Sequence, residues 1–128
     1  LGFDIELQKD GTAKLSFQMR NELIGNFLRG NLHGGVISSS LDVVGGLVAF
    51  VALLDQNPVQ SFDEGSEQFS KLGTVDLRVD FLRPGLGDSF VAAGFKLRAG
   101  RRIAVARMEL HNDSGALIAV GTGTYSIG

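Results

Sequence analysis

The feature that most constrains the fold is an apolar segment of 19 residues, from Val36 to Leu54, that contains no proline. A typical strand is much shorter, so we predict a helix here that ends before Pro58. Valine, isoleucine and glycine are poor helix formers in isolation. Because apolar residues occupy most sides of this helix, it is predicted to be central and to be held by burial in the domain.

The segments on either side alternate between apolar and polar residues, which is the period of a strand. Residues 2–7 and 12–19 are predicted to form a hairpin around the Asp10-Gly11 turn. Residues 55–71 are polar and acidic, and they are predicted to form a long surface loop. Four more strands are expected after that loop, at residues 74–82, 89–97, 103–110 and 116–126.

These elements predict an α+β fold. The short connections between the last strands imply an antiparallel sheet, and one apolar helix laid on its inner face makes a two-layer domain. A chain of 128 residues with 44% hydrophobic and 20% charged residues suits one domain, residues 1–128, with its own core.

Composition and charge disfavour several function classes. The net charge of −2 argues against nucleic acid as the main partner. The chain has no cysteine, which excludes disulfides, a cysteine nucleophile and thiolate metal sites, and two histidines make a poor metal site. The run from Leu41 to Leu54 is too short to span a bilayer, so no membrane partner is expected. No signal-peptide pattern opens the chain, and we expect a cytoplasmic location.

The residues best suited to chemistry lie at the start of the predicted helix. The helix is placed to begin near Gly34, so Asp42 lies about two turns inside it, where a carboxylate is costly unless it is hydrogen-bonded or paired. Backbone N–H groups at Gly34 and Gly35 are suited to hold developing negative charge. A base and an oxyanion site at this spacing are what acyl transfer requires. On spacing alone, structural roles for His33 and Asp42 stay open.

The predicted helix has two contrasting sides. Small and polar residues share one stripe, which leaves room for another chain or a ligand: Gly35, Ser38 or Ser39, Asp42, Gly46 and Ala49. Bulky apolar residues share another side, which is predicted to face the sheet: Val36, Val43, Leu47, Phe50 and Leu54. A serine nucleophile is not expected, because the three serines at 38–40 lack a Gly-x-Ser-x-Gly context.

The motif His33-Gly34-Gly35, followed by Asp42, resembles that of the hotdog-fold acyl-CoA thioesterases, specifically the phenylacetic-acid-degradation thioesterase-like branch. Three later segments, "TVDLRVDFLRPG", "AGRRIAVARMEL" and "SGALIAVGTGTY", are similar to the family's strand after the helix and to its last two strands. The resemblance implies a long central helix wrapped by a curved antiparallel sheet of about six strands. It also implies hydrolysis of an acyl-CoA to free acid and coenzyme A without a metal or organic cofactor.

The same resemblance implies roles for individual residues. Asp42 acts as general base or nucleophile, and the Gly34 N–H forms the oxyanion hole. His33 orients the site or assists at the thioester. Asn26 positions water or substrate, and Thr74 contributes from the start of the next strand. Two chains pair their sheets edge to edge as a homodimer, and such dimers often pair again as a homotetramer, with the active site between subunits; dimer and tetramer both stay open here.

Substrate binding is expected to involve residues around this motif and three arginines in loops or turns. Gly35 permits close approach of the substrate, and Ser39 lies on the same helix stripe. The phosphates of coenzyme A require cations, for which Arg83, Arg101 and Arg102 are candidates. A purely solvated role for each arginine is equally open.

Two alternative functions are weighed against the thioesterase. A hotdog dehydratase is disfavoured, because its His-x-x-Pro-Gly pattern is missing from this sequence. A non-catalytic acyl-CoA or lipid-binding module is possible on the same fold, and Asp42 argues against it. Aryl-acetyl, medium-chain and long-chain acyl groups all stay open.

Overall fold

A computed structural model of the chain describes residues 2–128. Within them lie two α-helices, one 3₁₀-helix and eight strands. In chain order these are β1 (Asp4–Leu7), β2 (Ala13–Gln18), η1 (Asn21–Leu23), β3 (Ile24–Asn26), β4 (Asn31–Leu32), α1 (Gly34–Gln56), α2 (Phe62–Ser70), β5 (Gly73–Phe81), β6 (Ser89–Ala99), β7 (Ile103–Asn112) and β8 (Leu117–Ser126).

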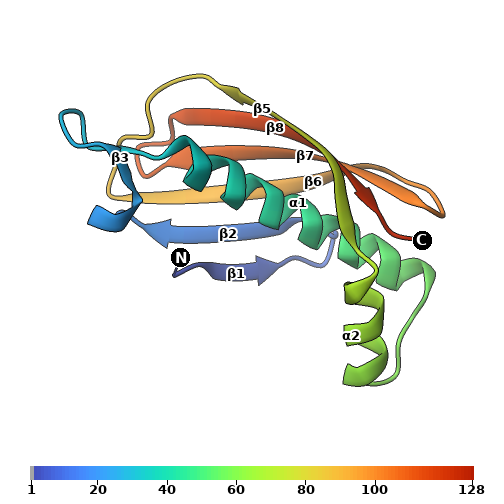
Figure 1. Cartoon of the computed structure of the whole chain (residues 1–128). Coiled ribbons are helices and arrows are strands. Elements are labelled where there is room, and N and C mark those ends of the chain that lie inside the picture. Colours follow the sequence, from blue (N-terminus) through green and yellow to red (C-terminus); the bar gives the residue numbers. More distant parts are fainter. Residues whose placement is uncertain (1) are drawn as a thin grey trace.

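Six of the strands form one antiparallel sheet in the order β1-β2-β6-β7-β8-β5. The sheet curves around α1, which lies along its inner face (Figure 1). The short strands β3 and β4 pair separately, just before the helix. The predicted α+β hotdog arrangement, one long helix wrapped by six antiparallel strands, is confirmed.

Helix α1 begins at Gly34 and ends at Gln56, so the predicted helix over residues 36–54 is confirmed with two more residues at each end. The whole helix, Gly34–Gln56, is long and apolar enough for a membrane span, whereas the apolar run from Leu41 to Leu54 alone is too short for one. However, 56% of its most apolar window is buried inside the domain. Packing against the sheet therefore accounts for its hydrophobicity.

The side of α1 that faces the sheet is not the predicted one. The buried side carries Ile37, Leu41, Val44 and Val48, all at most 3% exposed, whereas Val43 on the predicted side is 38% exposed. Both sides are apolar at helical spacing, so the pattern alone does not distinguish them. What distinguishes them is close packing. A Cβ on Gly94 of β6 would lie only 2.9 Å from the Val44 carbonyl oxygen, so glycine there lets the helix approach the sheet.

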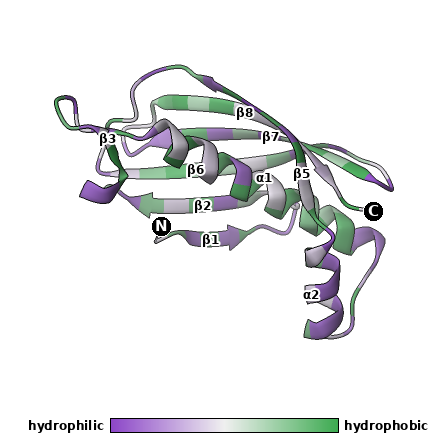
Figure 2. Ribbon diagram, viewed as in Figure 1, coloured by the Kyte–Doolittle hydropathy of each residue, from purple (hydrophilic) through white to green (hydrophobic). Residues whose placement is uncertain are grey.

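The predicted loop over residues 55–71 is wrong in its second half, which forms α2. The Ser61 hydroxyl accepts a hydrogen bond from the Glu64 N–H at 3.1 Å, and the Glu64 carboxylate accepts one from the Gln60 N–H at 2.9 Å. This is the Ser-x-x-Glu capping pattern of a helix start, and it is readable in the sequence. No residue of α2 is buried. The helix is largely hydrophilic and extends away from the sheet near the C-terminal end of α1 (Figure 2).

Candidate active site

The centre of the candidate site is the carboxylate of Asp42, on α1. Two hydroxyl groups donate hydrogen bonds to the same carboxylate oxygen, Oδ1: Thr74 Oγ1 at 3.0 Å and Tyr125 Oη at 3.1 Å. Asp42 is half-buried rather than deeply buried. Among residues 2–128 no hydrogen bond to its other oxygen, Oδ2, is found. The carboxylate is therefore fixed through one oxygen, and the other is available for chemistry.

The β5–β8 pair brings both hydroxyls to this oxygen. Thr74 near the start of β5 lies directly opposite Tyr125 of β8. The register then shifts between Thr74 and Asp76, an irregularity of the kind that redirects side chains beside active sites. Helix and sheet thus meet at one carboxylate, and the predicted neighbours Asp42 and Thr74 are brought together.

Tyr125 is the site residue that the sequence analysis missed. Its side chain is 1% exposed, and a Cβ on Gly45 of α1 would collide with its hydroxyl, so the helix needs glycine at that position. Burial raises the pKa of Tyr125, and the negative charge of Asp42 and the hydrogen bond to it raise that pKa further. Tyr125 therefore stays protonated and donates. The role of Tyr125 as a hydrogen-bond donor to Asp42 becomes apparent from its pairing with Thr74 across the two strands.

A cavity of about 220 Å³ opens beside the carboxylate. Its polar end is made by Asp42, Thr74 and Tyr125, and the rest of its lining is apolar or small: Val43, Gly46, Leu47, Phe69, Leu72 and Gly73. The cavity therefore suits a ligand whose polar reacting group lies beside Asp42 and whose hydrocarbon part contacts the apolar lining.

The predicted oxyanion residue, Gly34, lies elsewhere in the same chain. It begins α1, where the first N–H groups of a helix lack an intrahelical partner. At 1.5 Å per residue, the eight residues to Asp42 correspond to about 12 Å along the helix axis. One carbonyl group is far too small to contact both groups within a single chain.

His33 and Asn26 lie near the helix start rather than beside Asp42. His33 is the residue before α1, and its ring packs on β3, where a Cβ on Gly25 would be 2.9 Å from His33 Nδ1. The side-chain oxygen of Asn26 accepts a hydrogen bond from the Leu28 N–H at 3.1 Å, so Asn26 shapes the turn after β3. The structure does not bring Asn26 to Asp42 within one chain.

The other predicted binding residues are spread along α1. Gly35 and Ser39 lie on its exposed side, and a Cβ on Gly35 would meet open space. Arg83 lines a cavity of about 330 Å³ with Gly34 and Phe81, and it donates a hydrogen bond to the Leu117 carbonyl at 2.9 Å.

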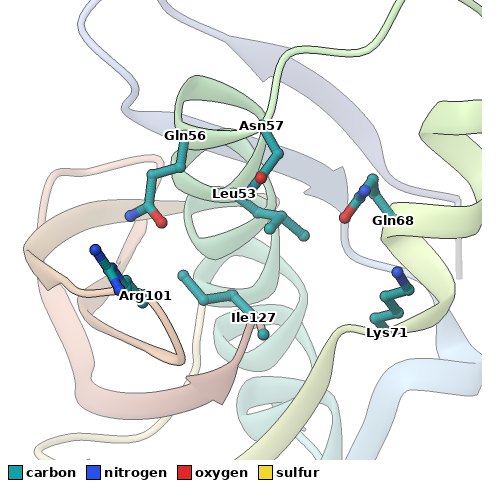
Figure 3. Close-up of a pocket in the computed structure, with 8 residues that line it drawn as sticks. Leu53, Gln56, Asn57, Gln68, Lys71, Arg101 and Ile127 are labelled. Carbon is teal, nitrogen blue, oxygen red and sulfur yellow. The ribbon is translucent and has the colours of Figure 1, made fainter.

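Arg101 lies at the opposite end of α1. It lines a cavity of about 660 Å³ with Lys71, Gln56 and Gln68. Figure 3 shows Arg101 and Lys71 on opposite sides of this cavity, with Leu53 and Ile127 between them. The neighbouring Arg102 is exposed and does not line it. Since a helix of this length spans roughly 33 Å, Arg83 and Arg101 do not converge on one phosphate group in a single chain.

Comparison with known proteins gives consistent matches. A family model described as thioesterase superfamily matches residues 29–119. The medium/long-chain acyl-CoA thioesterase YigI of Escherichia coli (strain K12) is 45% identical over 128 residues, which are 100% of this chain and 83% of that protein.

Two solved structures are similar over nearly the whole chain. A crystal structure of a Shewanella oneidensis protein related to the thioesterase superfamily superimposes with a TM-score of 0.89 at 46% identity, covering 98% of this chain and 82% of that one. A crystal structure from Syntrophus aciditrophicus gives a TM-score of 0.86 at 42% identity, covering 99% of this chain and 84% of that one.

Proposed function

Because the chain belongs to the thioesterase superfamily, we propose that it hydrolyses the thioester bond of an acyl-CoA to give a free acid and coenzyme A. The observation that carries this proposal is the Asp42 carboxylate, fixed through one oxygen at the polar end of an apolar cavity. The name of the YigI relative supports a medium or long aliphatic acyl group. Membership of the phenylacetic-acid-degradation branch stays a prediction.

In this mechanism the free oxygen of Asp42 acts on the thioester carbonyl. As a general base it takes a proton from a water molecule, whose oxygen adds to the carbonyl carbon. As a nucleophile it adds to that carbon itself, and water then hydrolyses the mixed anhydride. In both routes the carbon–sulfur bond breaks, and the leaving coenzyme A thiolate takes up a proton. Thr74 and Tyr125 keep the carboxylate in one orientation throughout.

The developing oxyanion is held by the Gly34 N–H of a second copy of the chain. The separation of about 12 Å between Gly34 and Asp42 along one helix supports a site completed by two subunits. Strand β5 ends the sheet, and such an edge is suited to pair with another chain. Its Val75 and Phe81 are 62% and 56% exposed, which favours coverage by a partner. Self-association to a homodimer or a homotetramer, with the active site between subunits, is therefore part of the proposal.

The assembly of two chains also suggests roles for the other predicted site residues. His33 and Asn26 lie at the helix start, and they belong with Gly34 to the oxyanion half of the site. Arg83 beside Gly34, and the pair Arg101 and Lys71 at the other end of α1, are the cations proposed for the coenzyme A phosphates. Arg102, which is exposed, is proposed as a further cation for these phosphates. A cytoplasmic location stays a prediction from the sequence.

The test is the release of free thiol from a panel of acyl-CoAs, both aromatic and aliphatic. Steady turnover of at least one ester supports the thioesterase. Saturable binding of the panel without thiol release would favour the non-catalytic binding module. Hydration of an enoyl-CoA without thiol release would favour the dehydratase.

A further inference from the structure

A second apolar cavity adjoins the one beside Asp42 and shares one lining residue with it. It has a volume of about 520 Å³ and lies between the second half of α1 and α2. Its lining is Phe50, Leu54, Val59, Ser61, Phe62, Gly65, Ser66 and Phe69. Phe69 lines both cavities, so the two hollows meet at this side chain.

Phe69, which lines both cavities, forms an aromatic pair with Phe50. The rings of Phe50 on α1 and Phe69 on α2 pack edge to face, with centroids 5.1 Å apart and planes at 87°. Phe69 is 52% exposed, so its ring is held by this contact and not by surrounding core. Of the two rings, Phe69 lines the cavity beside Asp42 and also the second one, whereas Phe50 lines only the second. A side chain as exposed as Phe69 has room to change its rotamer.

The chemistry of the second cavity fits a hydrocarbon. No charged side chain lines it, and one of its two serines, Ser61, is already occupied in capping α2. The nucleotide of coenzyme A requires cations, and neither cavity is lined by one. Phe62 is 87% exposed and Val43 is 38% exposed. An aliphatic chain laid along this surface would remove these apolar groups from water, which is favourable.

We propose that the aliphatic tail of the acyl group runs from Asp42 along α1 into the cavity beneath α2, and that the Phe50–Phe69 pair sets the chain length that is preferred. The inference rests on the proposed thioesterase function. Shorter acyl groups end within the cavity beside Asp42. Longer ones reach the second cavity only by displacing Phe69, so α2 acts as the chain-length selector of the enzyme.

The test compares kcat/KM for saturated acyl-CoAs from butyryl-CoA to stearoyl-CoA in the wild type and in Phe69→Ala. In the wild type each added methylene raises kcat/KM by roughly fourfold until the first cavity is filled. Phe69→Ala joins the two cavities, so the preferred length shifts upward and the ratio of long-chain to medium-chain kcat/KM rises by about tenfold. The comparison is made as a ratio of long-chain to medium-chain kcat/KM within each protein, so a uniform effect of Phe69→Ala on the cavity beside Asp42 cancels.

Two controls separate this effect from a general one. Phe95→Ala removes a phenylalanine that is 38% exposed and lines neither cavity, and its chain-length profile is expected to match the wild type. Phe69→Leu keeps an apolar group at the junction and is expected to shift the profile less than alanine does. An unshifted profile in Phe69→Ala, or an equal loss on every ester, overturns the inference while leaving the thioesterase intact.

Binding measurements keep the inference testable if no ester is hydrolysed. S-alkyl-CoA thioethers of the same chain lengths lack the scissile carbonyl, and calorimetry gives their Kd without turnover. We expect the longest thioethers to bind Phe69→Ala about tenfold more tightly, relative to medium ones, than they bind the wild type. Absence of turnover by the wild type refutes the proposed function. Absence of any length-dependent change in Kd refutes the chain-length selector.

Discussion

The hydroxyl of Tyr125 donates a hydrogen bond to Oδ1 of Asp42 across 3.1 Å, joining two residues that are 83 positions apart in the sequence. The bond ties the last strand of the sheet to the central helix at the proposed reacting group. Tyr125 is the single tyrosine of a chain that has no tryptophan. Its absorbance therefore reports directly on this contact.

The first prediction concerns the ionisation of Tyr125. Burial, the charge of Asp42 and the hydrogen bond all raise its pKa, so the wild-type tyrosine is expected to ionise well above the ordinary pH of about 10. Asp42→Asn removes the negative charge but not the burial. An ultraviolet difference titration of tyrosinate should therefore give a lower pKa in Asp42→Asn than in the wild type, still above the ordinary value. Identical titrations would show that the two groups do not interact.

The second prediction concerns stability at alkaline pH. Since the pKa of Tyr125 is higher in the folded state than in the unfolded chain, its contribution to stability is complete below about pH 10 and is lost as the pH rises toward the folded value. Tyr125→Phe should be less stable than the wild type by about 1–2 kcal/mol at neutral pH. Urea unfolding should show that this difference narrows above about pH 10. A constant difference at all pH values would contradict the expected linkage.

The third prediction concerns Thr74. Its hydroxyl holds the same oxygen of Asp42 at 3.0 Å, and hydrogen bonds to charged groups contribute about 1.5–3 kcal/mol where they are shielded from water. Thr74 is exposed, so Thr74→Val is expected to lower kcat/KM by about tenfold, the low end of that range. Thr74→Ser keeps the hydroxyl and should retain most of the activity. Equal losses in both variants would mean that the methyl group, and not the hydrogen bond, matters.

The fourth prediction concerns the contact between helix and sheet. A Cβ on Gly94 would lie 2.9 Å from the Val44 carbonyl oxygen and 3.0 Å from Val48 Cγ2, so Gly94→Ala should destabilise the fold by about 1–3 kcal/mol. Gly35→Ala is the matched control, because a Cβ there meets open space on the helix. Alanine favours a helix over glycine, so urea unfolding should find this control at least as stable as the wild type. Equal stability of both variants would refute the close-packing account.

Much of this fold follows from local pattern. Alternation marks the strands, and the long apolar segment without proline marks α1, including its start at Gly34. The buried face of α1 could not be predicted from the sequence pattern, because the helix has two apolar sides. The side that faces the sheet is the one that packs closely against Gly94. The second helix was readable from Ser61 and Glu64, whose capping pattern the acidic composition of the segment obscured.

The candidate site is only partly accessible from sequence. The motif from His33 to Asp42 and the placement of Thr74 come from the family resemblance, and the structure joins Asp42 to Thr74. Tyr125 has no local signal, since its role depends on strand register and on the space that Gly45 leaves. The rise of the helix per residue places Gly34 and Asp42 about 12 Å apart along its axis, so the two groups cannot act on one carbonyl within a single chain.

The catalytic role of Asp42 is best tested by thiol release from Asp42→Asn beside the wild type, on the acyl-CoA that the wild type hydrolyses best. Asparagine keeps the shape of the side chain and can still accept hydrogen bonds from Thr74 and Tyr125, but it is neither a base nor a carboxylate nucleophile. A catalytic role for Asp42 predicts that Asp42→Asn stays folded, shown by an unchanged cooperative unfolding transition, and loses at least about a hundredfold in kcat. A folded Asp42→Asn protein that retains the wild-type rate would contradict it.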